Sequence, residues 1–133
     1  MQAGAEGQNV VSTSDGFEGF TPPGIITVSA AALKLAQEFS DHLRREQAGK
    51  DWIVSFDWAD SRAMRIPRPG GPMQELGPGF DLAAYERRFV PAKAIQNSAG
   101  VTFVVKVPSR IWLNSARRLI DTDGSLGSGL TLR

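Results

Sequence analysis

Two carboxylates and a hydroxyl lie close together near the middle of the sequence. Asp57 and Asp60 are three residues apart, and Ser61 follows directly. A pair of carboxylates can perform general acid–base catalysis when both side chains converge on one substrate. Ser61 has no nearby base and no strand–turn–helix setting that would make it a nucleophile. Because no second polar cluster completes a site, we expect no catalytic residues and no enzymatic activity, with a small enzyme using these three residues as an alternative.

These polar residues connect two predicted strands. Trp52–Trp58 is a run typical of a buried strand, and Arg62–Ile66 indicates a second one. Polar groups held at the ends of rigid strands commonly form binding sites. We therefore predict a candidate interaction surface at this connection, made of Asp57, Asp60, Ser61, Arg62 and Met64.

A second acidic motif, Leu-Ile-Asp-Thr-Asp-Gly-Ser-Leu at Leu119–Leu126, is similar to the phosphotransferase signature of the haloacid-dehalogenase family. In that family the first aspartate is the nucleophile and the second is an acid–base group. The lysine and the further aspartates that the family places downstream do not follow here. Aspartate and glycine both favour turns, so we expect a turn at Asp121–Gly124 rather than a catalytic or calcium site.

The absence of cysteine removes several classes of chemistry. A chain with no cysteine has no disulfide, no thiolate nucleophile and no cysteine-ligated zinc or iron–sulfur centre. Its one histidine, His42, lies beside the apolar stripe of a predicted helix without a visible partner, so we interpret it as structural. We expect no cofactor and no metal site, and leave open residual metal binding through Asp57, Asp60 or His42.

The balance of charge does not indicate a nucleic-acid-binding protein. Fifteen basic and fourteen acidic residues give a net charge of +1, without a dense basic face. No run approaches the ~18 apolar residues that span a bilayer, and no secretory signal is visible. We expect a cytoplasmic protein whose partner is another protein or a second copy of itself, with no nucleic acid and no membrane involved.

The chain divides into a leader and one domain. Residues 1–24 are rich in glycine, serine, glutamine and threonine, carry a charge of −3 and lack helical or strand periodicity. We predict a flexible leader over 1–24, in which Phe17 and Phe20 could dock on a partner or on the domain. Residues 25–133 then form a single domain of ordinary size.

Hydrophobic periodicity and turn residues predict the elements of this domain. A strand over Ile25–Val28 precedes a helix that has Ser29 as its N-cap and ends near Gly49. A surface loop is expected over Pro67–Gly79, whereas Phe80–Val90 is compatible with helix or strand. The remaining predictions are a helical turn over Pro91–Ile95, a turn over Asn97–Gly100, a strand over Val101–Val107, a helix over Ser109–Leu119 and a strand over Leu130–Leu132.

The order of these elements and two local strings resemble the HesB-like family of A-type iron–sulfur carriers. Those proteins open with Ile-x-Val/Leu-Ser/Thr before an alanine-rich helix, as Ile26–Ala32 does here. They close with a Gly-Val-x-Phe-Val-Val strand, a Pro-x-Ser-type turn, an apolar-Asp strand and a final glycine-containing strand. The corresponding segments are Gly100–Val105, Pro108–Ser109, Leu119–Asp121 and Gly127–Leu132.

The resemblance covers about residues 25–132 and implies a particular fold. It implies a β-rich α+β fold, a small two-sheet β-sandwich or barrel-like domain with one main N-terminal helix. It also implies a strand at Phe80–Tyr85, a brief helical turn after Pro108 and a strand that leads to Asp121.

The cluster ligands of that family are missing from this sequence. The loop cysteine of its Cys-Ser-Gly-Met motif falls on Ser61, and its Cys-Gly-Cys tail has no counterpart after Leu132. A serine hydroxyl is a poor replacement for a thiolate toward iron. The resemblance therefore implies a non-enzymatic HesB-like domain that acts as a binding or protein-interaction module. The alternative is an accessory factor in iron–sulfur cluster assembly that binds a cysteine-bearing partner through Phe17 and Phe20.

Overall fold

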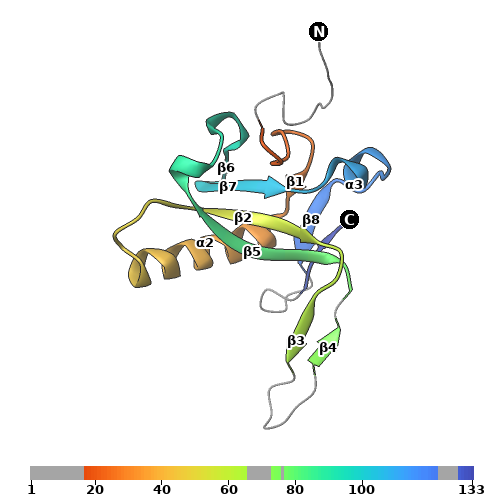
Figure 1. Ribbon diagram of the computed structural model, residues 1–133, viewed down its shortest axis with the longest axis horizontal. Coiled ribbons are helices and arrows are strands. Elements are labelled where there is room, and N and C mark those ends of the chain that lie inside the picture. The colour runs from red at the N-terminus through yellow and green to blue at the C-terminus, as the bar shows by residue number, and fades with distance from the viewer. Residues whose placement is uncertain (1–16, 66–72, 76, 123–128) are drawn as a thin grey trace.

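The computed structural model describes residues 17–65, 73–75, 77–122 and 129–133, shown in colour in Figure 1. Residues 1–16 of the predicted leader, most of the predicted loop after residue 66 and the turn residues 123–128 lie outside the described part of the chain. In chain order the elements, with η for 3-10 helices, are β1 (Thr27–Val28), α2 (Ala30–Glu46), β2 (Trp52–Ala59), β3 (Ala63–Arg65), β4 (Met73–Glu75), β5 (Gly79–Glu86), η1 (Arg87–Phe89), η2 (Ala92–Ala94), β6 (Gln96–Ser98), β7 (Val101–Lys106), α3 (Ser109–Leu113), β8 (Leu119–Thr122) and β9 (Leu130–Leu132).

Most of the strands belong to two mixed sheets. One has four strands in the order β5–β2–β7–β6, and the other has three in the order β1–β8–β9. β2 runs antiparallel to β5 but parallel to β7, and β1 runs parallel to β8. The strands β3 and β4 form a separate hairpin that projects from the rest of the domain (Figure 1). The α+β prediction is confirmed, whereas its barrel-like form is wrong because the described strands do not close into a barrel.

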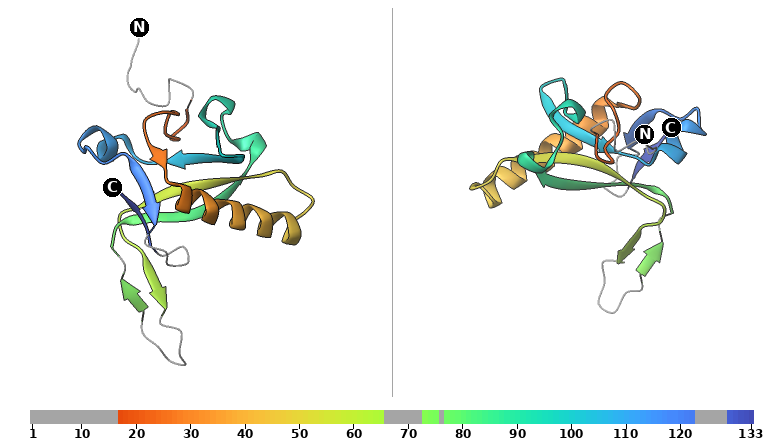
Figure 2. Two further views of the ribbon diagram at one scale, coloured as in Figure 1. Left: turned by 180° about the vertical axis from the view of Figure 1, so that it is seen from behind. Right: turned by 45° about the horizontal axis from the view of Figure 1, so that its top comes forward.

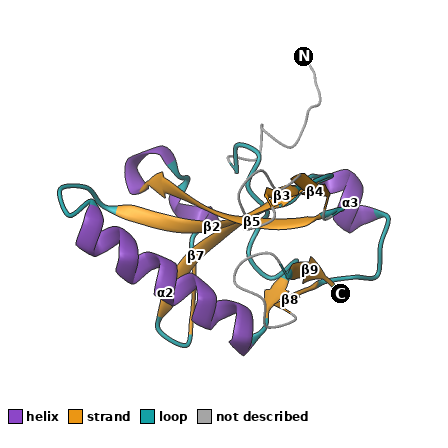
Figure 3. Ribbon diagram, turned by 90° about the horizontal axis from the view of Figure 1, so that it is seen from below, coloured by secondary structure: helices purple, strands orange, loops and turns teal. Residues whose placement is uncertain are grey.

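The main helix α2 lies along one face of the four-stranded sheet and also reaches β8 (Figures 2 and 3). The Ser29 side chain accepts a hydrogen bond from the Ala32 N–H at 3.1 Å, which confirms the predicted N-cap. The helix ends at Glu46, before the predicted Gly49. Its buried residues recur at helical spacing and are Ala32, Leu33, Ala36 and Leu43.

The alternation of side chains along β2 divides the core into two clusters. Val54 and Phe56 are buried toward α2, in the larger cluster, which continues into the three-stranded sheet at Ile120. Ile53 is buried in a second, smaller cluster that it shares with Val104 of β7. The sheet is therefore covered on both faces, with α2 on one side and, on the other, Phe20 of the N-terminal segment together with Val90 and Ala94 of the η1–η2 region.

The N-terminal arm, Phe17–Gly24, helps to cover the second face. Phe20 is only 7% exposed and belongs to the smaller core cluster. The Thr21 N–H donates to the Val105 carbonyl at 2.7 Å, and the Val107 N–H donates to the Thr21 hydroxyl at 2.9 Å. The prediction of a flexible leader over 1–24 is therefore wrong for this part, because aromatic burial and strand-like hydrogen bonds hold it on the domain.

Some element predictions were wrong, and one segment that the sequence left open between helix and strand is resolved. The segment Pro67–Gly79, predicted as a loop, contains β4 and the first residue of β5. The helix predicted over Ser109–Leu119 is the short α3 followed by β8, as the family resemblance implied. The ambiguous segment Phe80–Val90 consists of β5 and η1. No helix in the described part of the chain has the length and apolar character needed to cross a membrane.

Candidate functional site

Asp57 lies on the sheet face opposite α2, hydrogen-bonded to Ser55 and Tyr85. One carboxylate oxygen accepts from the Tyr85 hydroxyl at 2.6 Å, and the other accepts from the buried Ser55 hydroxyl. The Lys106 ammonium lies 5.4 Å from the Tyr85 ring centroid and 5.3 Å from that of Phe20. Burial, followed by the hydrogen bond and charge of Asp57, raises the pKa of Tyr85 to about 12. Asp57 therefore holds a neutral phenol in place beneath the N-terminal arm.

The ionisation of Tyr85 tests this arrangement directly, because the chain has a single tyrosine. We expect the phenol to titrate near pH 12 rather than at its ordinary value of 10. A raised pKa in the folded state means that the neutral phenol stabilises the fold below pH 10, and that this stabilisation is lost as the pH rises to about 12. Ultraviolet absorbance recorded directly after a stopped-flow pH jump measures the midpoint. Asp57→Asn should move the midpoint down toward 10, and a wild-type midpoint at 10 would contradict the Tyr85–Asp57 hydrogen bond.

Asp60 has a different set of partners. Its carboxylate accepts from the Trp58 indole N–H at 2.9 Å and from the Arg110 guanidinium at 2.7 Å. The hydrogen bonds from Trp58 and then Arg110 hold the pKa of Asp60 below its usual value. A carboxylate with a lowered pKa stays ionised at neutral pH, so Asp60 is suited to holding Arg110 and not to donating a proton.

The remaining residues of the predicted interaction surface do not all lie at the surface. Ser61 is exposed, as predicted, but Arg62 is only 8% exposed. The Arg62 guanidinium donates to three backbone carbonyls, those of Gly77, Pro78 and Phe80. Arg62 therefore supports the start of β5 instead of facing a partner. For Met64 the structure describes only the backbone, which lies in β3.

The predicted surface therefore separates into two parts. Asp57 turns toward Tyr85 on the face that the arm covers, whereas Asp60 turns toward Arg110 of α3. The two carboxylates thus share no hydrogen-bond partner among the described residues, and the alternative of an enzyme that uses Asp57, Asp60 and Ser61 gains no support from their contacts. His42 is exposed on α2, and the described residues contain no group of three or more His, Cys, Asp or Glu side chains that could hold a metal ion.

Asp121, from the second acidic motif, lies between neighbouring elements of the fold. Hydrogen bonds from the Ser29 side chain and then from the Thr122 backbone N–H hold the pKa of Asp121 below its usual value. The Thr122 N–H donates at 2.8 Å, and the Arg133 guanidinium lies 3.5 Å from the same carboxylate. Asp121 thus connects β8 with the N-cap of α2 and with the residue after β9, while Asp123 and Gly124 of the predicted turn lie outside the described residues.

The contact between Asp60 and Arg110 places the predicted interaction loop beside α3. We call this surface the α3 face and define it by Asp60, Ser61, Arg110, Leu113 and Arg117, all of which are exposed. Leu113 is 65% exposed, one of two large hydrophobic side chains on the described surface with so much area in solvent. A shallow pocket of about 300 Å³ opens here, with the apolar Trp58, Ile111 and Leu132 and the basic Arg110 and Arg117 among its lining residues.

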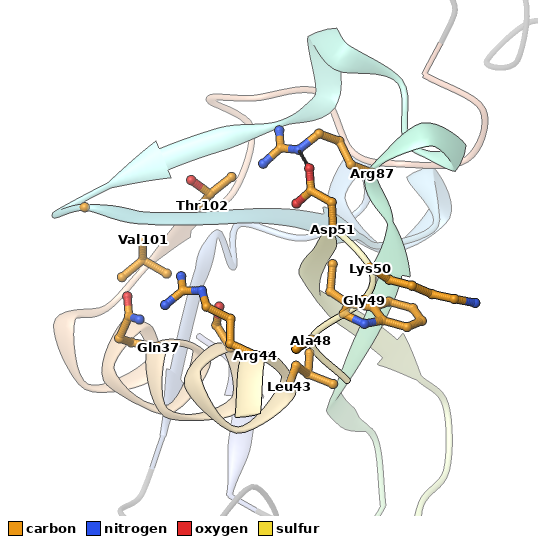
Figure 4. A pocket seen from close by; sticks show the side chains of 13 residues that line it. Gln37, Leu43, Arg44, Ala48, Gly49, Lys50, Asp51, Arg87, Val101 and Thr102 are labelled. Atoms are coloured by element: carbon orange, nitrogen blue, oxygen red, sulfur yellow. Dashed lines mark hydrogen bonds and ion pairs between the residues drawn. The ribbon is translucent and has the colours of Figure 1, made fainter. Parts of the chain in front are cut away.

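A larger pocket of about 440 Å³ lies between the C-terminal half of α2, the α2–β2 connection and the start of β7 (Figure 4). In this view the Lys50 ammonium points away from the pocket. Arg44 forms an ion pair with Asp41 at 3.1 Å, and Arg87 forms one with Asp51 at 2.9 Å. Its arginines therefore already have acidic neighbours, and the C-terminal end of a helix disfavours anions. The pocket gives no indication of a ligand class, so the α3 face is the stronger candidate.

Comparisons of the chain with protein-family models, with curated proteins and with solved structures found no match. The HesB-like resemblance therefore stays a prediction from sequence, and the function is argued from the geometry of the α3 face.

Sequence reasoning missed the residues that complete both parts of the site. Tyr85 was placed on a strand only by the family resemblance, and nothing in the sequence showed that this strand pairs with β2. Arg110 and Leu113 were assigned to a long helix with an inward apolar face. The family resemblance did imply a brief helical turn after Pro108, which is the N-cap of α3.

Proposed function

We propose that this chain is a non-enzymatic, HesB-like protein-interaction module that binds its partner at the α3 face. The ion pair between Asp60 and Arg110, at 2.7 Å, carries the proposal. Both side chains are largely exposed, so the pair adds little to stability. Its effect is geometric, since it holds the end of β2 next to α3 and so brings a polar loop and an exposed apolar side chain into one surface.

The chemistry of the α3 face supports a specific kind of partner. Asp60 neutralises Arg110, whereas Arg117 forms no ion pair within the described part of the chain, so the surface is positively charged at neutral pH. Leu113 and the apolar part of the shallow pocket provide a place for a buried anchor, and such anchors supply most of the energy of protein interfaces. Arginine side chains bind carboxylates in a bidentate geometry. The partner is therefore a protein segment with one aliphatic or aromatic anchor flanked by aspartate or glutamate.

The HesB-like character of the proposal is supported by the order of elements and by the position of Ser61. The domain has one main helix near its N-terminus and two mixed sheets, in keeping with the resemblance. Ser61 stands where that family has a cluster cysteine, and it is exposed beside Asp60. A surface that holds a cluster in the family would in this chain be free to bind a protein.

The alternative of an assembly accessory that binds through Phe17 and Phe20 has less support. Phe20 is buried against the domain, and its ring lies edge-on to Tyr85 at 5.4 Å. The Phe17 ring lies 4.8 Å from the Lys93 ammonium. Binding through these rings would first require the arm to leave the sheet.

Selection of peptides from a random display library on the full chain tests the proposal. We expect enriched peptides with an apolar residue flanked by carboxylates, and binding measured by fluorescence anisotropy that falls at least tenfold in Leu113→Glu and in Arg117→Glu, since both changes add negative charge to the α3 face.

The matched control for this experiment is Phe89→Ser. Phe89 is 62% exposed, nearly as much as Leu113, but it lies in η1 and outside the α3 face. Phe89→Ser should bind the selected peptides as the wild type does. Enrichment without an acidic pattern, or equal binding by Leu113→Glu, would contradict the proposal, as would a selection that enriches no peptide.

A further inference from the structure

The strand β5 has one unpaired edge in the described part of the chain. It pairs with β2 over its whole length, from Trp52 opposite Glu86 to Ala59 opposite Gly79, and is the last strand of its sheet. The Arg87 N–H donates to the Asp51 carbonyl at 2.9 Å. This bond identifies which residues of β5 direct their backbone N–H and C=O groups toward β2. Backbone groups alternate in direction along a strand, so the N–H and C=O of Leu82, Ala84 and Glu86 point away from β2.

Some of the other exposed backbone near this sheet is already occupied. Beyond the short β6, the arm residue Thr21 takes up the Val105 carbonyl and the Val107 N–H at the far side of β7. At the start of β5, the outward carbonyl of Phe80 accepts from Arg62 at 3.3 Å. Among the described residues, no hydrogen-bond partner outside the ladder with β2 is found for the backbone of Leu82 or Ala84.

The exposed edge of β5 lacks several of the features that usually prevent strand pairing, although the start of the strand lies against Arg62 and Leu130 of β9. Natural edge strands are protected by lysine, by proline, by bulges or by a covering segment. The sequence of β5, Gly-Phe-Asp-Leu-Ala-Ala-Tyr-Glu, contains neither lysine nor proline, and its register with β2 runs without a bulge. The small side chains of Ala83 and Ala84 at its centre leave room for a second strand to approach.

We propose that β5 pairs antiparallel with β5 of a second copy of this chain, around a two-fold axis at Ala83. In this register Leu82 lies opposite Ala84 of the partner subunit, and the two pairs exchange four backbone hydrogen bonds. Asp81 lies opposite Tyr85 of the partner subunit, so no like charges meet across the axis. The pairing joins two four-stranded sheets into one continuous sheet.

The self-complementary register favours a second copy over an unrelated peptide. A two-fold axis at Ala83 places the smallest side chains of the strand together, and the charged Asp81 and Glu86 lie away from it. An interface built on one strand pair is small, so the dimer is weak. This contact does not involve the α3 face, so its test and the peptide-binding test can fail independently.

A single introduced cysteine tests the register, because the chain has no cysteine of its own. The two Ala83 Cα atoms form a non-hydrogen-bonded pair about 4.5 Å apart, within the range that a disulfide spans. Mild oxidation of the full-length Ala83→Cys variant should convert most of the protein into a disulfide-linked dimer. Ser98→Cys, exposed on β6, is the matched control and should form dimer at least tenfold more slowly. Equal rates for the two variants would overturn the proposal.

A second measurement does not depend on crosslinking. Sedimentation equilibrium of the wild type from about 10 μM to 1 mM should show a reversible monomer–dimer equilibrium. Ala84→Pro removes one outward N–H without breaking a bond to β2, and should lower the association constant at least tenfold. Ala84→Ser keeps the N–H and should associate like the wild type. A wild type that is monomeric throughout this range, or a dimer unaffected by Ala84→Pro, would overturn the proposal.

Discussion

Replacing Arg62 by methionine should lower the free energy of unfolding by roughly 3 kcal/mol, because it leaves three buried or partly buried carbonyls without their donor. Arg62 is 8% exposed, and its guanidinium donates to the carbonyls of Gly77, Pro78 and Phe80 at 3.2, 3.4 and 3.3 Å. Methionine fills much of the same volume but cannot donate a hydrogen bond. The loss is therefore one of polar contacts more than of packing, and urea unfolding at pH 7 measures it.

The Arg62 guanidinium is also tightly packed against the neighbouring chain. A Cβ atom placed on Gly79 would lie 2.5 Å from the Arg62 guanidinium carbon and 2.7 Å from the Leu130 carbonyl oxygen. The side chain therefore has little freedom to move to another position. Arg110→Met is the control, since the Arg110–Asp60 pair is exposed and should cost less than about 1 kcal/mol. Equal losses in the two variants would contradict a structural role for Arg62.

Elements with a strong local signal were predictable from the sequence. The cap at Ser29 and the apolar spacing after it predicted α2, and the β-branched run from Val101 predicted β7. The segment Ser109–Leu119 has helical propensity throughout, yet its second half is β8. That strand forms because its backbone pairs with β1 and β9, which lie far away in sequence. Pairing over such distances leaves no local pattern to detect.

The candidate site was predictable only in part, for the same reason. Sequence placed Asp57, Asp60 and Ser61 at the end of a strand, and the structure confirms that Asp60 and Ser61 are exposed there. It could not show that Asp57 belongs to the strand face covered by the N-terminal arm, or that Asp60 meets Arg110, fifty residues away. Arginine side chains are mostly exposed in proteins, so the sequence predicted a surface position for Arg62. Its burial follows from the path of the chain between β4 and β5, which only the structure describes.

Replacing Phe20 by alanine tests whether the N-terminal arm is an integral part of the domain. The ring is 7% exposed, packs edge-on against Tyr85 at 5.4 Å and lies 5.3 Å from the Lys106 ammonium. Truncation of a buried phenylalanine usually costs about 3–5 kcal/mol. Because the arm can detach without unfolding the sheets, we expect a smaller loss than this, about 2–3 kcal/mol in urea unfolding.

Hydrogen exchange separates detachment of the arm from general loosening in Phe20→Ala. The amides of Thr21 and Val107, which are bonded across the arm, should exchange much faster, while those of Val54 and Phe56 in β2 stay protected. Phe89→Ala is the control, because that ring is 62% exposed and its loss should change stability by less than about 0.5 kcal/mol. If Phe20→Ala were as stable as this control, the arm would not be part of the core, and Phe17 and Phe20 would be free to bind a partner. A large loss would instead show that the arm belongs to the folded domain and packs on the sheet face bearing Ser55 and Tyr85, which leaves the α3 face and the edge of β5 as the stronger candidates for partner binding.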